Sequence, residues 1–442
     1  MIAVNYNEAL AKINSLMLFG SRPGLDRILQ FLNLLGNPQE KLKFVHIAGT
    51  NGKGSTSKMI SSVLKESGYH TGLFISPYII DFRERMQING EMIDKKTLAE
   101  YVTKTYPVIE KLKADGIIIT EFEYITALAF LWYADSRCDI VVLETGMGGL
   151  LDSTNVVNNT LVSVITSISH DHTAILGNTL EEIATQKGGI IKPNSNTVYH
   201  RQNDIADTVI STIATQMNNT LFYADILPLD IQEQTIEYTK CLFNNIPLTI
   251  HLIGSHQIRN LKLALSTLEI LKTKFNFAIT DTTLASGLAK AEMPARLELI
   301  CQSPVVLIDG AHNPDGMNAL SDALEKYLPH KKIVCIMGML KDKDSNSSLE
   351  YLDGLIDSVI TLEPDNPRKQ TKDELAEKAV KFFDKVYPME NFSQAIDKAL
   401  DMAGDEGAVV VCGSLYLASQ LRPLIVRCLK KRNKTTLIDI QE

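Results

Sequence analysis

The chain has 442 residues, with charges of both signs and a formal net charge of −8. This length exceeds what one hydrophobic core usually serves, so we expect about two or three domains. The acidic balance excludes a general nucleic-acid binder, which needs a basic surface. Six cysteines without a C-x-x-C pair, several of them inside apolar runs, predict buried free thiols in a reducing compartment. The N-terminus lacks a leader pattern and no apolar run has bilayer length, so we expect a cytoplasmic protein without membrane contact.

The segment 42–68 predicts a phosphate-binding loop between a strand and a helix. Residues 42–48 are apolar and β-rich, and residues 56–64 carry apolar side chains at helical spacing. Such a loop aims backbone N–H groups and the positive end of the helix at phosphate oxygens. Lys53 can reach the terminal phosphates, and the hydroxyl of Ser55 or Thr56 can hold Mg²⁺. The residues of this candidate ATP loop are Gly49, Thr50, Asn51, Gly52, Lys53, Gly54, Ser55 and Thr56.

The spacing within this loop departs from the common G-x-x-x-x-G-K-[ST] pattern. Position 47 is Ile, and Gly54 separates Lys53 from Ser55. A glycine-rich turn that merely caps a helix is the alternative interpretation.

Strands and helices alternate through both halves of the chain, which indicates an α/β protein with parallel sheets. The predicted strands cover residues 42–48, 71–76, 140–144 and 161–167, then 305–308, 332–337, 358–362 and 409–412. A hairpin is expected between residues 232 and 253, a helix over 257–271 and a hinge over 291–296. We therefore expect a P-loop ATPase-like domain with a mostly parallel sheet over residues 1–295 and a smaller Rossmann-like α/β domain over 296–442.

Polar side chains follow several of these strands, where ligands bind in open α/β sheets. Glu144 ends an apolar strand and is suited to Mg²⁺, which takes oxygen ligands; the alternative is a solvated acid at a strand end. His170 and His172 flank Asp171, but a zinc ligand set is not completed nearby. A histidine on a second Mg²⁺ and a structural histidine both stay open.

Two further positions carry competing interpretations. Lys187 stands before the paired glycines 188 and 189 and can face a pocket, although composition alone favours a solvated helix-end lysine. Asp309 and His312 follow the strand 305–308 and are expected to face the space between the two domains. Helix capping explains Asp309 or Asn313 almost as well.

The motifs taken together resemble one known family. They are HIAGTNGKGST, FISPYIIDFRERMQING, TEFEYITALAF, ETGMGG with LDSTN, SHDHTAILGNT, IATQKGGIIKP, DGAHNP and CGSLYL. Their order over nearly the whole chain is similar to the folylpolyglutamate synthase and dihydrofolate synthase family of the Mur ligase superfamily. The resemblance implies an ATP-dependent ligase that joins L-glutamate to a folate or to dihydropteroate through an acyl phosphate, giving ADP and phosphate. It also implies a monomer without a nucleic-acid partner.

The resemblance assigns roles to individual residues. It implies catalytic roles for Lys53, Glu144, His172 and Lys187, and contacts to ATP from the loop 49–56 and from Asn260, Arg296, Asp309 and His312. It implies two Mg²⁺ ions, the first on Ser55 with Glu144 and the second on His172 with a carbamylated Lys187. The residues expected near the folate-type substrate are Ser76, Pro77, Tyr78, Arg83 and Asp152.

Some residues depart from the family pattern. Tyr78 stands where the family often has His, Arg83 where it often has Asn, and Leu150 where many members have Arg. Leu150 removes a cation, which puts substrate choice in doubt more than ATP binding. Three hypotheses follow: a folate ligase, a related Mur-type ligase acting on another carboxylate, and a nucleotide-binding paralogue without catalysis.

Overall fold

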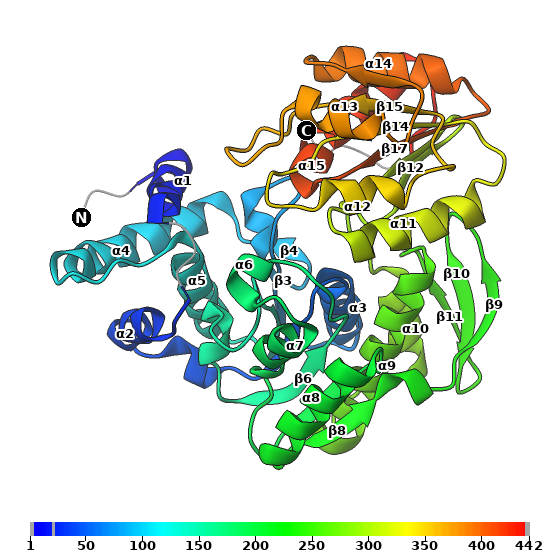
Figure 1. Cartoon of the computed structure of the whole chain (residues 1–442). Helices are drawn as coiled ribbons and strands as arrows, with labels where there is room; N and C mark the ends of the chain where they lie inside the picture. The colour runs from blue at the N-terminus through cyan, green and yellow to red at the C-terminus, as the bar shows by residue number, and fades with distance from the viewer. Residues whose placement is uncertain (1–3, 20–22, 438–442) are drawn as a thin grey trace. The chain divides into compact units, whose positions relative to one another are not determined.

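An eight-stranded, mostly parallel sheet forms the centre of the first of two units in the computed structural model, which describes residues 4–19 and 23–437 (Figure 1). Unit 1 comprises residues 1–229, 243–246 and 259–291. Unit 2 comprises residues 230–242, 247–258 and 292–442. The last part of unit 1 therefore follows the first part of unit 2 in the sequence.

The sheet of unit 1 has the strand order β4-β3-β2-β5-β1-β6-β7-β8. Its strands are β1 (Phe44–Ala48), β2 (Thr71–Phe74), β3 (Met86–Ile88), β4 (Glu91–Met92), β5 (Ile140–Glu144), β6 (Thr160–Ile165), β7 (Asn196–Tyr199) and β8 (Thr220–Tyr223). Antiparallel pairing joins β2 to β3 and β3 to β4, and the other pairs are parallel. All residues of β1 and β5 are buried, as expected where helices cover both faces of a parallel sheet. The carboxyl ends of the parallel strands share one edge.

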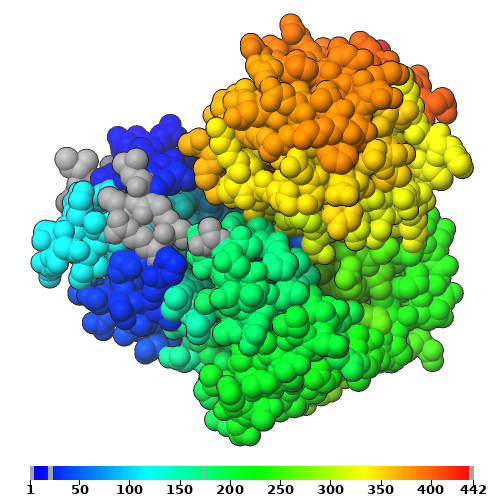
Figure 2. All heavy atoms as spheres, viewed as in Figure 1, coloured from blue at the N-terminus to red at the C-terminus, as the bar shows by residue number. Residues whose placement is uncertain are grey.

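Helices of unit 1 surround this sheet. They are α1 (Tyr6–Ser15), α2 (Asp26–Leu34), α3 (Lys53–Glu66), α4 (Lys95–Ala114), α5 (Glu121–Asp135), α6 (Thr173–Leu176), α7 (Leu180–Gly188), α8 (Asp204–Gln216), most of α9 (Ser255–Phe275), and α10 (Asp281–Ala289). One apolar cluster joins α1, α2, α4 and α5 to the sheet and includes Phe31, Phe44 and Phe130. A second cluster, with Ile183 and Ile210, joins α7 and α8 to the region of β6 and β7. Figure 2 shows the α7 and α8 region, in green, on the face of unit 1 that is turned toward the viewer.

The helix that follows the candidate phosphate loop, α3, is covered by α10. Ser62 Oγ in α3 donates a hydrogen bond of 2.7 Å to the backbone oxygen of Gly287 in α10. Glu66 accepts from Lys290 Nζ at 2.6 Å and from Ser286 Oγ at 3.0 Å. Residues more than 200 positions away in the sequence therefore hold the helix on which the loop is built.

Unit 2 contains a three-stranded sheet and a six-stranded sheet. The strands are β9 (Asp230–Gln234), β10 (Thr239–Phe243) and β11 (Ile246–Ile250), then β12 (Glu298–Gln302), β13 (Val305–Ile308), β14 (Ile333–Met337), β15 (Ser358–Thr361), β16 (Val386–Pro388) and β17 (Ala408–Cys412). The larger sheet has the order β12-β13-β17-β14-β15-β16, with β12 antiparallel to β13 and the rest parallel. Its helices are α11 (Pro314–Tyr327), α12 (Ser345–Glu350), α13 (Lys372–Ala379), α14 (Phe392–Ala403) and α15 (Leu415–Lys431).

The predicted α/β fold class is confirmed, with a large mostly parallel sheet followed by a second α/β sheet. The strands predicted over 71–76 and 161–167 end two residues earlier than expected, at Phe74 and Ile165. The expected hairpin is β10 and β11, whose turn residues Asn244 and Asn245 have φ angles of 49° and 65°. The functional division into residues 1–295 and 296–442 stays a prediction. Within the described residues, no helix has the length and apolar character that a bilayer span requires.

The close packing of α10 on α3 predicts the effect of a single methyl group. A Cβ atom on Gly287 would lie 2.5 Å from Val63 Cα and 2.8 Å from Val63 N. Gly287→Ala is therefore expected to lower the free energy of unfolding by about 1–3 kcal/mol, although Ala normally favours a helix over Gly by roughly 1 kcal/mol. Urea unfolding measures the change.

Thr282→Ala on the exposed side of α10 is the matched control. It is expected to leave stability unchanged or slightly raised. A Gly287→Ala protein as stable as this control would show that α10 does not hold α3 at the observed distance.

Candidate functional site

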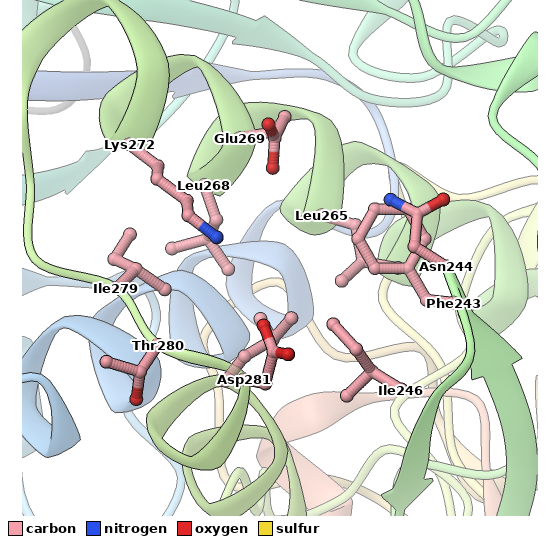
Figure 3. Close-up of a pocket in the computed structure, with 11 residues that line it drawn as sticks. Phe243, Asn244, Ile246, Leu265, Leu268, Glu269, Lys272, Ile279, Thr280 and Asp281 are labelled. Carbon is pink, nitrogen blue, oxygen red and sulfur yellow. The ribbon is translucent and has the colours of Figure 1, made fainter.

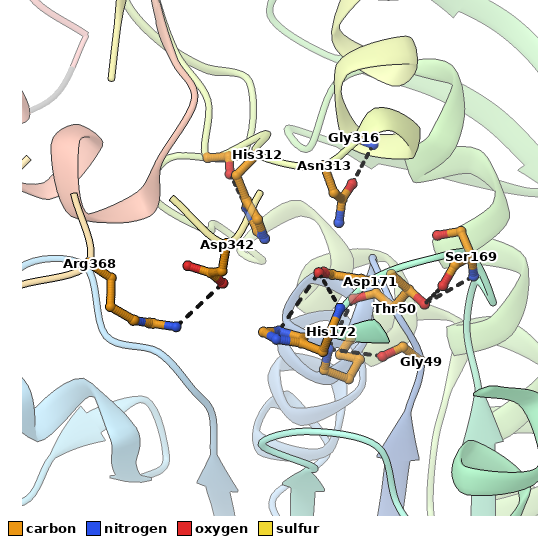
Figure 4. Close-up of polar contacts among 12 residues, drawn as sticks. Gly49, Thr50, Ser169, Asp171, His172, His312, Asn313, Gly316, Asp342 and Arg368 are labelled. Atoms are coloured by element: carbon orange, nitrogen blue, oxygen red, sulfur yellow. Dashed lines mark hydrogen bonds and ion pairs between the residues drawn. The ribbon is translucent and has the colours of Figure 1, made fainter. Parts of the chain in front are cut away.

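The candidate phosphate loop connects β1 to α3 and is held by the chain segment that follows β6. Thr50 N donates to Ser167 O at 2.6 Å, and Asn51 N donates to Ser167 Oγ at 2.9 Å. Thr50 Oγ1 and the backbone of Ser169 exchange two hydrogen bonds of 3.0 Å (Figure 4). The loop conformation is therefore fixed by contacts with a neighbouring strand end.

Two glycines of the loop are required by close contacts. A Cβ atom on Gly49 would overlap Thr166 Oγ1, and one on Gly52 would overlap Asn260 Oδ1. Gly52 also has a φ of 88° and is the N-cap of α3, to which it offers no side-chain acceptor. The first turn of an α-helix has N–H groups without intrahelical partners, and with the helix dipole it favours anions.

Lys53, the first residue of α3, places its charge over this loop. Its Nζ donates to the backbone oxygens of Gly49 and Thr50, each at 3.0 Å. Lys53 is also close enough to Lys187 to help lower the pKa of that residue. The positive charge needed for a phosphate ligand is thus present at the loop.

Glu144 and Ser55 lie on adjoining elements at the carboxyl edge of the sheet. Glu144 is the last residue of β5 and pairs with Ile47 of β1. Thr50 of the phosphate loop follows Ile47 by three residues. Its side chain is buried, and Oε2 accepts from Ser76 N at 3.1 Å. Ser55 is buried in the first turn of α3. A carboxylate and a hydroxyl near a phosphate loop are oxygen donors of the kind that Mg²⁺ takes.

Lys187 is buried, so the interpretation as a solvated helix-end lysine is wrong. It is 2% exposed in the last turn of α7. Gly188 packs against Ile213 of α8, and Gly189 packs against Leu150, so side chains from distant segments enclose the end of α7. Burial, reinforced by Lys53, lowers its pKa to about 7, with Asp171 and Asp152 acting in the opposite direction.

His172 lies at the exposed start of α6. Its φ is 50°, and its backbone N–H donates to Asp171 Oδ1 at 2.8 Å. The ring Nε2 lies 3.9 Å from the same Asp171 oxygen (Figure 4). Across the described residues, His, Cys, Asp and Glu side chains form no group of three or more that could hold a metal ion.

The segment predicted to contact the folate-type substrate contains two differently placed arginines. Arg83 forms a fork with Asp81, at 3.0 Å from Nε and 2.8 Å from the second guanidinium nitrogen. Arg85, which the sequence interpretation did not select, is buried beneath Tyr78 and donates to Ser76 Oγ at 3.4 Å. Its guanidinium lies 5.3 Å from the Tyr78 ring centre, and within the described part of the chain its Nε has no acceptor. The sequence signal for Arg85 was its place in the R-E-R segment that follows S-P-Y. The structure packs the exposed Tyr78 of that motif on this arginine.

Asp152 braces the loop that follows β5. Its carboxylate accepts from Met147 N at 2.8 Å, from Thr154 N at 3.0 Å and from Thr154 Oγ1 at 2.6 Å. Burial raises its pKa, which these hydrogen bonds partly counteract. Its described contacts are therefore with its own loop. Pro77 lies in a cis peptide bond with Ser76.

Within unit 2, Asp309 binds the backbone beside Arg296. Its carboxylate accepts from Leu297 N and from Ala311 N, each at 2.7 Å. Ala295 and Leu297 have φ angles of 54° and 48°, which non-glycine residues seldom adopt. Asp309 thus stabilises a strained segment, and burial raises its pKa while Arg296 lowers it.

His312 and Asn313 follow Asp309 at the start of α11. His312 Nδ1 lies 2.7 Å from Gly310 O, and Asn313 Oδ1 accepts from Gly316 N at 2.8 Å (Figure 4). Asn313 is therefore the helix cap, which was one of the two interpretations of this motif. Asp309 and Arg296 come together in unit 2, while the phosphate loop, Asn260, Asp152 and Lys187 come together in unit 1.

A separate cavity of about 270 Å³ lies in unit 1 between the β10–β11 turn and helices α9 and α10 (Figure 3). Leu265, Leu268 and Leu284 form part of its apolar wall, and Lys272 and Asp281 carry charges at its lining. None of the residues selected from the sequence lines it, so we do not assign this cavity to the reaction.

Comparisons with known proteins agree with the motifs. The family described as Mur ligase middle domain matches residues 47–268, and the family described as Mur ligase, glutamate ligase domain matches residues 295–415. The dihydrofolate synthase/folylpolyglutamate synthase of Bacillus subtilis is 37% identical over 94% of this chain and 98% of its own length.

Solved structures are similar over the same extent. Mycobacterium tuberculosis folylpolyglutamate synthase complexed with ADP has a TM-score of 0.87 and 30% identity, covering 95% of this chain and 99% of that one. Escherichia coli FolC in complex with DHPP and ADP has a TM-score of 0.84 and 26% identity, covering 98% of this chain and 99% of that one.

The buried Lys187 predicts a pH-dependent cost to stability. Its folded pKa of about 7 lies below the ordinary value of 10.5, so the unfolded chain binds the extra proton between these pH values. The loss of folding stability caused by the buried Lys187 is therefore complete below pH 7, and it disappears as the pH rises toward 10.5. Lys187→Met is therefore expected to raise the free energy of unfolding at pH 7 by up to about 5 kcal/mol, and by much less near pH 10.

Urea unfolding in CO₂-free buffer across this range measures the effect. Lys96→Met, at a side chain that is 87% exposed, is the control and is expected to show no such trend. A difference between Lys187→Met and the unaltered protein that is constant with pH would contradict the buried neutral amine.

Proposed function

The chain belongs to the Mur ligase family, among the folylpolyglutamate and dihydrofolate synthases, and from this we propose that it is an ATP-dependent ligase. It joins L-glutamate to the carboxyl group of a folate, of dihydropteroate, or of both, and releases ADP and phosphate. The observation that carries the proposal is the phosphate loop with Lys53, placed at the same sheet edge as the buried Glu144.

The first step is activation of the acceptor carboxylate. A carboxylate is a poor electrophile, so its oxygen attacks the γ-phosphorus of ATP, the bond to ADP breaks, and an acyl phosphate forms. This step concentrates negative charge on the transferring group. Lys53 and the N-terminus of α3 stabilise that charge from fixed positions, which is the main contribution of a protein to phosphoryl transfer.

Donors for Mg²⁺ are present at this edge. Ser55 and Glu144 offer the oxygen ligands that the ion prefers and are buried on two elements beside the loop. His172 offers a ring nitrogen for a second ion. Bound Mg²⁺ would offset charge on the phosphate oxygens.

The state of Lys187 fits a carbamate. A neutral amine adds to CO₂ and loses a proton to give a carbamate, which replaces a buried positive group by an oxygen donor. Lys187 reaches the neutral form near pH 7 and lies near Lys53 and Asp171. We therefore assign it, in carbamylated form, to the second ion together with His172.

The second step is attack by the amine of L-glutamate on the acyl carbon, with loss of phosphate. Water competes for the same acyl phosphate, so the reaction needs a site from which water is excluded. We assign ATP contacts to the loop 49–56 and Asn260 in unit 1, and to Arg296, Asp309 and His312 in unit 2. On this proposal residues 1–295 and 296–442 act as the two ligase domains of a cytoplasmic monomer.

The acceptor is assigned to the segment that carries Ser76, Pro77 and Tyr78, with Asp152 in the neighbouring loop. Arg83 is paired with Asp81, and Arg85, which lies 3.8 Å from Glu121, is buried behind Tyr78. Leu150 is 39% exposed and adds an apolar surface where a cation is frequent in the family.

Acceptor-dependent phosphate release tests the proposal. The purified chain receives Mg²⁺, ATP and L-glutamate with dihydropteroate, with tetrahydrofolate or without acceptor, and products are identified by mass. We expect phosphate release together with the gain of one glutamate by at least one acceptor. Lys53→Met is expected to lower the rate by roughly 10²–10³-fold.

The other outcomes separate the competing hypotheses. ATP binding without release on any carboxylate would support a nucleotide-binding paralogue. Release that depends on a carboxylate of another class would support a related Mur-type ligase. The identity of the folate acceptor that gains glutamate distinguishes dihydrofolate synthase from folylpolyglutamate synthase activity.

A further inference from the structure

A buried chain of hydrogen bonds links β1 to the loop that follows Glu144. His46 Nε2 lies 2.8 Å from Thr154 Oγ1. Thr154 Oγ1 lies 2.6 Å from Asp152 Oδ1, and Asp152 Oδ2 accepts from Met147 N at 2.8 Å. His46 and Thr154 are 0% exposed, so water does not compete for these bonds.

The direction of the chain follows from the number of protons available. Asp152 accepts three hydrogen bonds, so the single proton of the Thr154 hydroxyl is donated to it. The Thr154 oxygen must then accept from His46, which requires a proton on Nε2. The other ring nitrogen, Nδ1, is buried, has no hydrogen-bond partner among the residues that the structure describes, and carries a lone pair in this tautomer. Burial, reinforced by Lys192, lowers the pKa of His46 well below its ordinary value and agrees with a neutral ring.

The loop held by this chain contacts the parts assigned to the reaction. Met147 is three residues beyond Glu144. Leu150 N donates to Gln186 O at 2.7 Å, and a Cβ atom on Gly149 would lie 3.0 Å from Lys187 O. One loop therefore continues from Glu144 and packs against the backbone that carries Lys187.

A second set of bonds closes the loop on its other side. Asn155 Nδ2 donates to the backbone oxygens of Leu150 and Gly189, each at 3.0 Å. Lys192 Nζ donates to Asn155 Oδ1 at 2.9 Å. Thr145 N donates to Ile47 O at 2.9 Å and ties the start of the loop to β1, and the bond from His46 ties Thr154, near the end of the loop, to the same strand.

We propose that His46 and Thr154 are positioning residues of the ligase reaction, which set the loop 145–155 and through it the orientation of Glu144 and Lys187. The inference rests on the proposed function. Neither side chain touches substrate in this role. Removal of one member of a buried pair leaves the other unsatisfied and lowers stability, so the positioning role is tested by kinetics of the folded variants.

The tautomer is tested without activity. Nitrogen-15 NMR of the full chain resolves the two ring nitrogens of each of the nine histidines, and His46→Gln identifies the signal of His46. We expect a neutral ring with the proton on Nε2, and a shift of that nitrogen in Thr154→Val. A proton on Nδ1 would overturn the proposal.

Kinetics test the positioning role. Thr154→Val keeps the shape of the side chain and removes the hydroxyl. We expect kcat to fall and the Mg²⁺ concentration for half-maximal rate to rise, each by about tenfold or more, with a smaller change in the KM for ATP. Thr197→Val in β7 is the matched control, because Thr197 is also fully buried in this sheet and its hydroxyl has no partner.

A folded Thr154→Val enzyme with the kcat and Mg²⁺ dependence of Thr197→Val would overturn the proposal. Should Thr154→Val not fold, His46→Gln and His46→Leu decide. The glutamine amide can still donate to Thr154 and is expected to retain most activity, whereas leucine cannot; equal rates for the two would overturn the positioning role. An unaltered chain inactive on every acceptor would instead remove the proposed function, while the NMR result would still stand.

Discussion

The close approach of the phosphate loop to the end of β6 is the constraint on which the rest of unit 1 depends. Gly49 has no room for a side chain beside Thr166, and the backbone of Ser167 and Ser169 fixes Thr50. These contacts take up the loop's own polar groups on the side of β6. The first turn of α3 is thereby held in place at the edge of the sheet, where its N-terminus favours an anion.

Several lysines lie near this edge of the sheet, and the pKa values of two of them are lowered toward loss of charge. Burial and the nearby charge of Lys53 lower the pKa of Lys187 to about 7. Burial alone lowers the pKa of Lys192 to about 8. A buried, protonated Lys187 would lose hydration and be repelled by the half-buried Lys53. A neutral Lys187 avoids this repulsion. The loop 145–155 continues from Glu144 and packs against the backbone of Lys187.

Local patterns in the sequence were sufficient for the strand, loop and helix around Lys53 and for the alternation of strands and helices. They could not place Lys187, because the end of α7 that carries it is packed in the fold, where Gly188 meets Ile213 of α8 and Gly189 meets Leu150. The burial of Arg85 was not predicted because it too depends on contacts made in the fold, whereas Arg83 and Asp81 stand two residues apart and their pairing is a local feature that the sequence interpretation missed. Short strands such as β7 and β8 lack enough residues to show a periodic pattern.

The cover of α3 by α10 has a consequence for synthesis of the chain. Residues 53–66 leave the ribosome early, but Gly287 and Lys290, which pack on this helix, are made more than 200 residues later. The nascent chain must therefore carry an incompletely covered α3 through production of the β9–β11 segment. During this interval its exposed apolar face is open to chaperones or to misassociation, and a truncated chain that stops before α10 lacks part of unit 1.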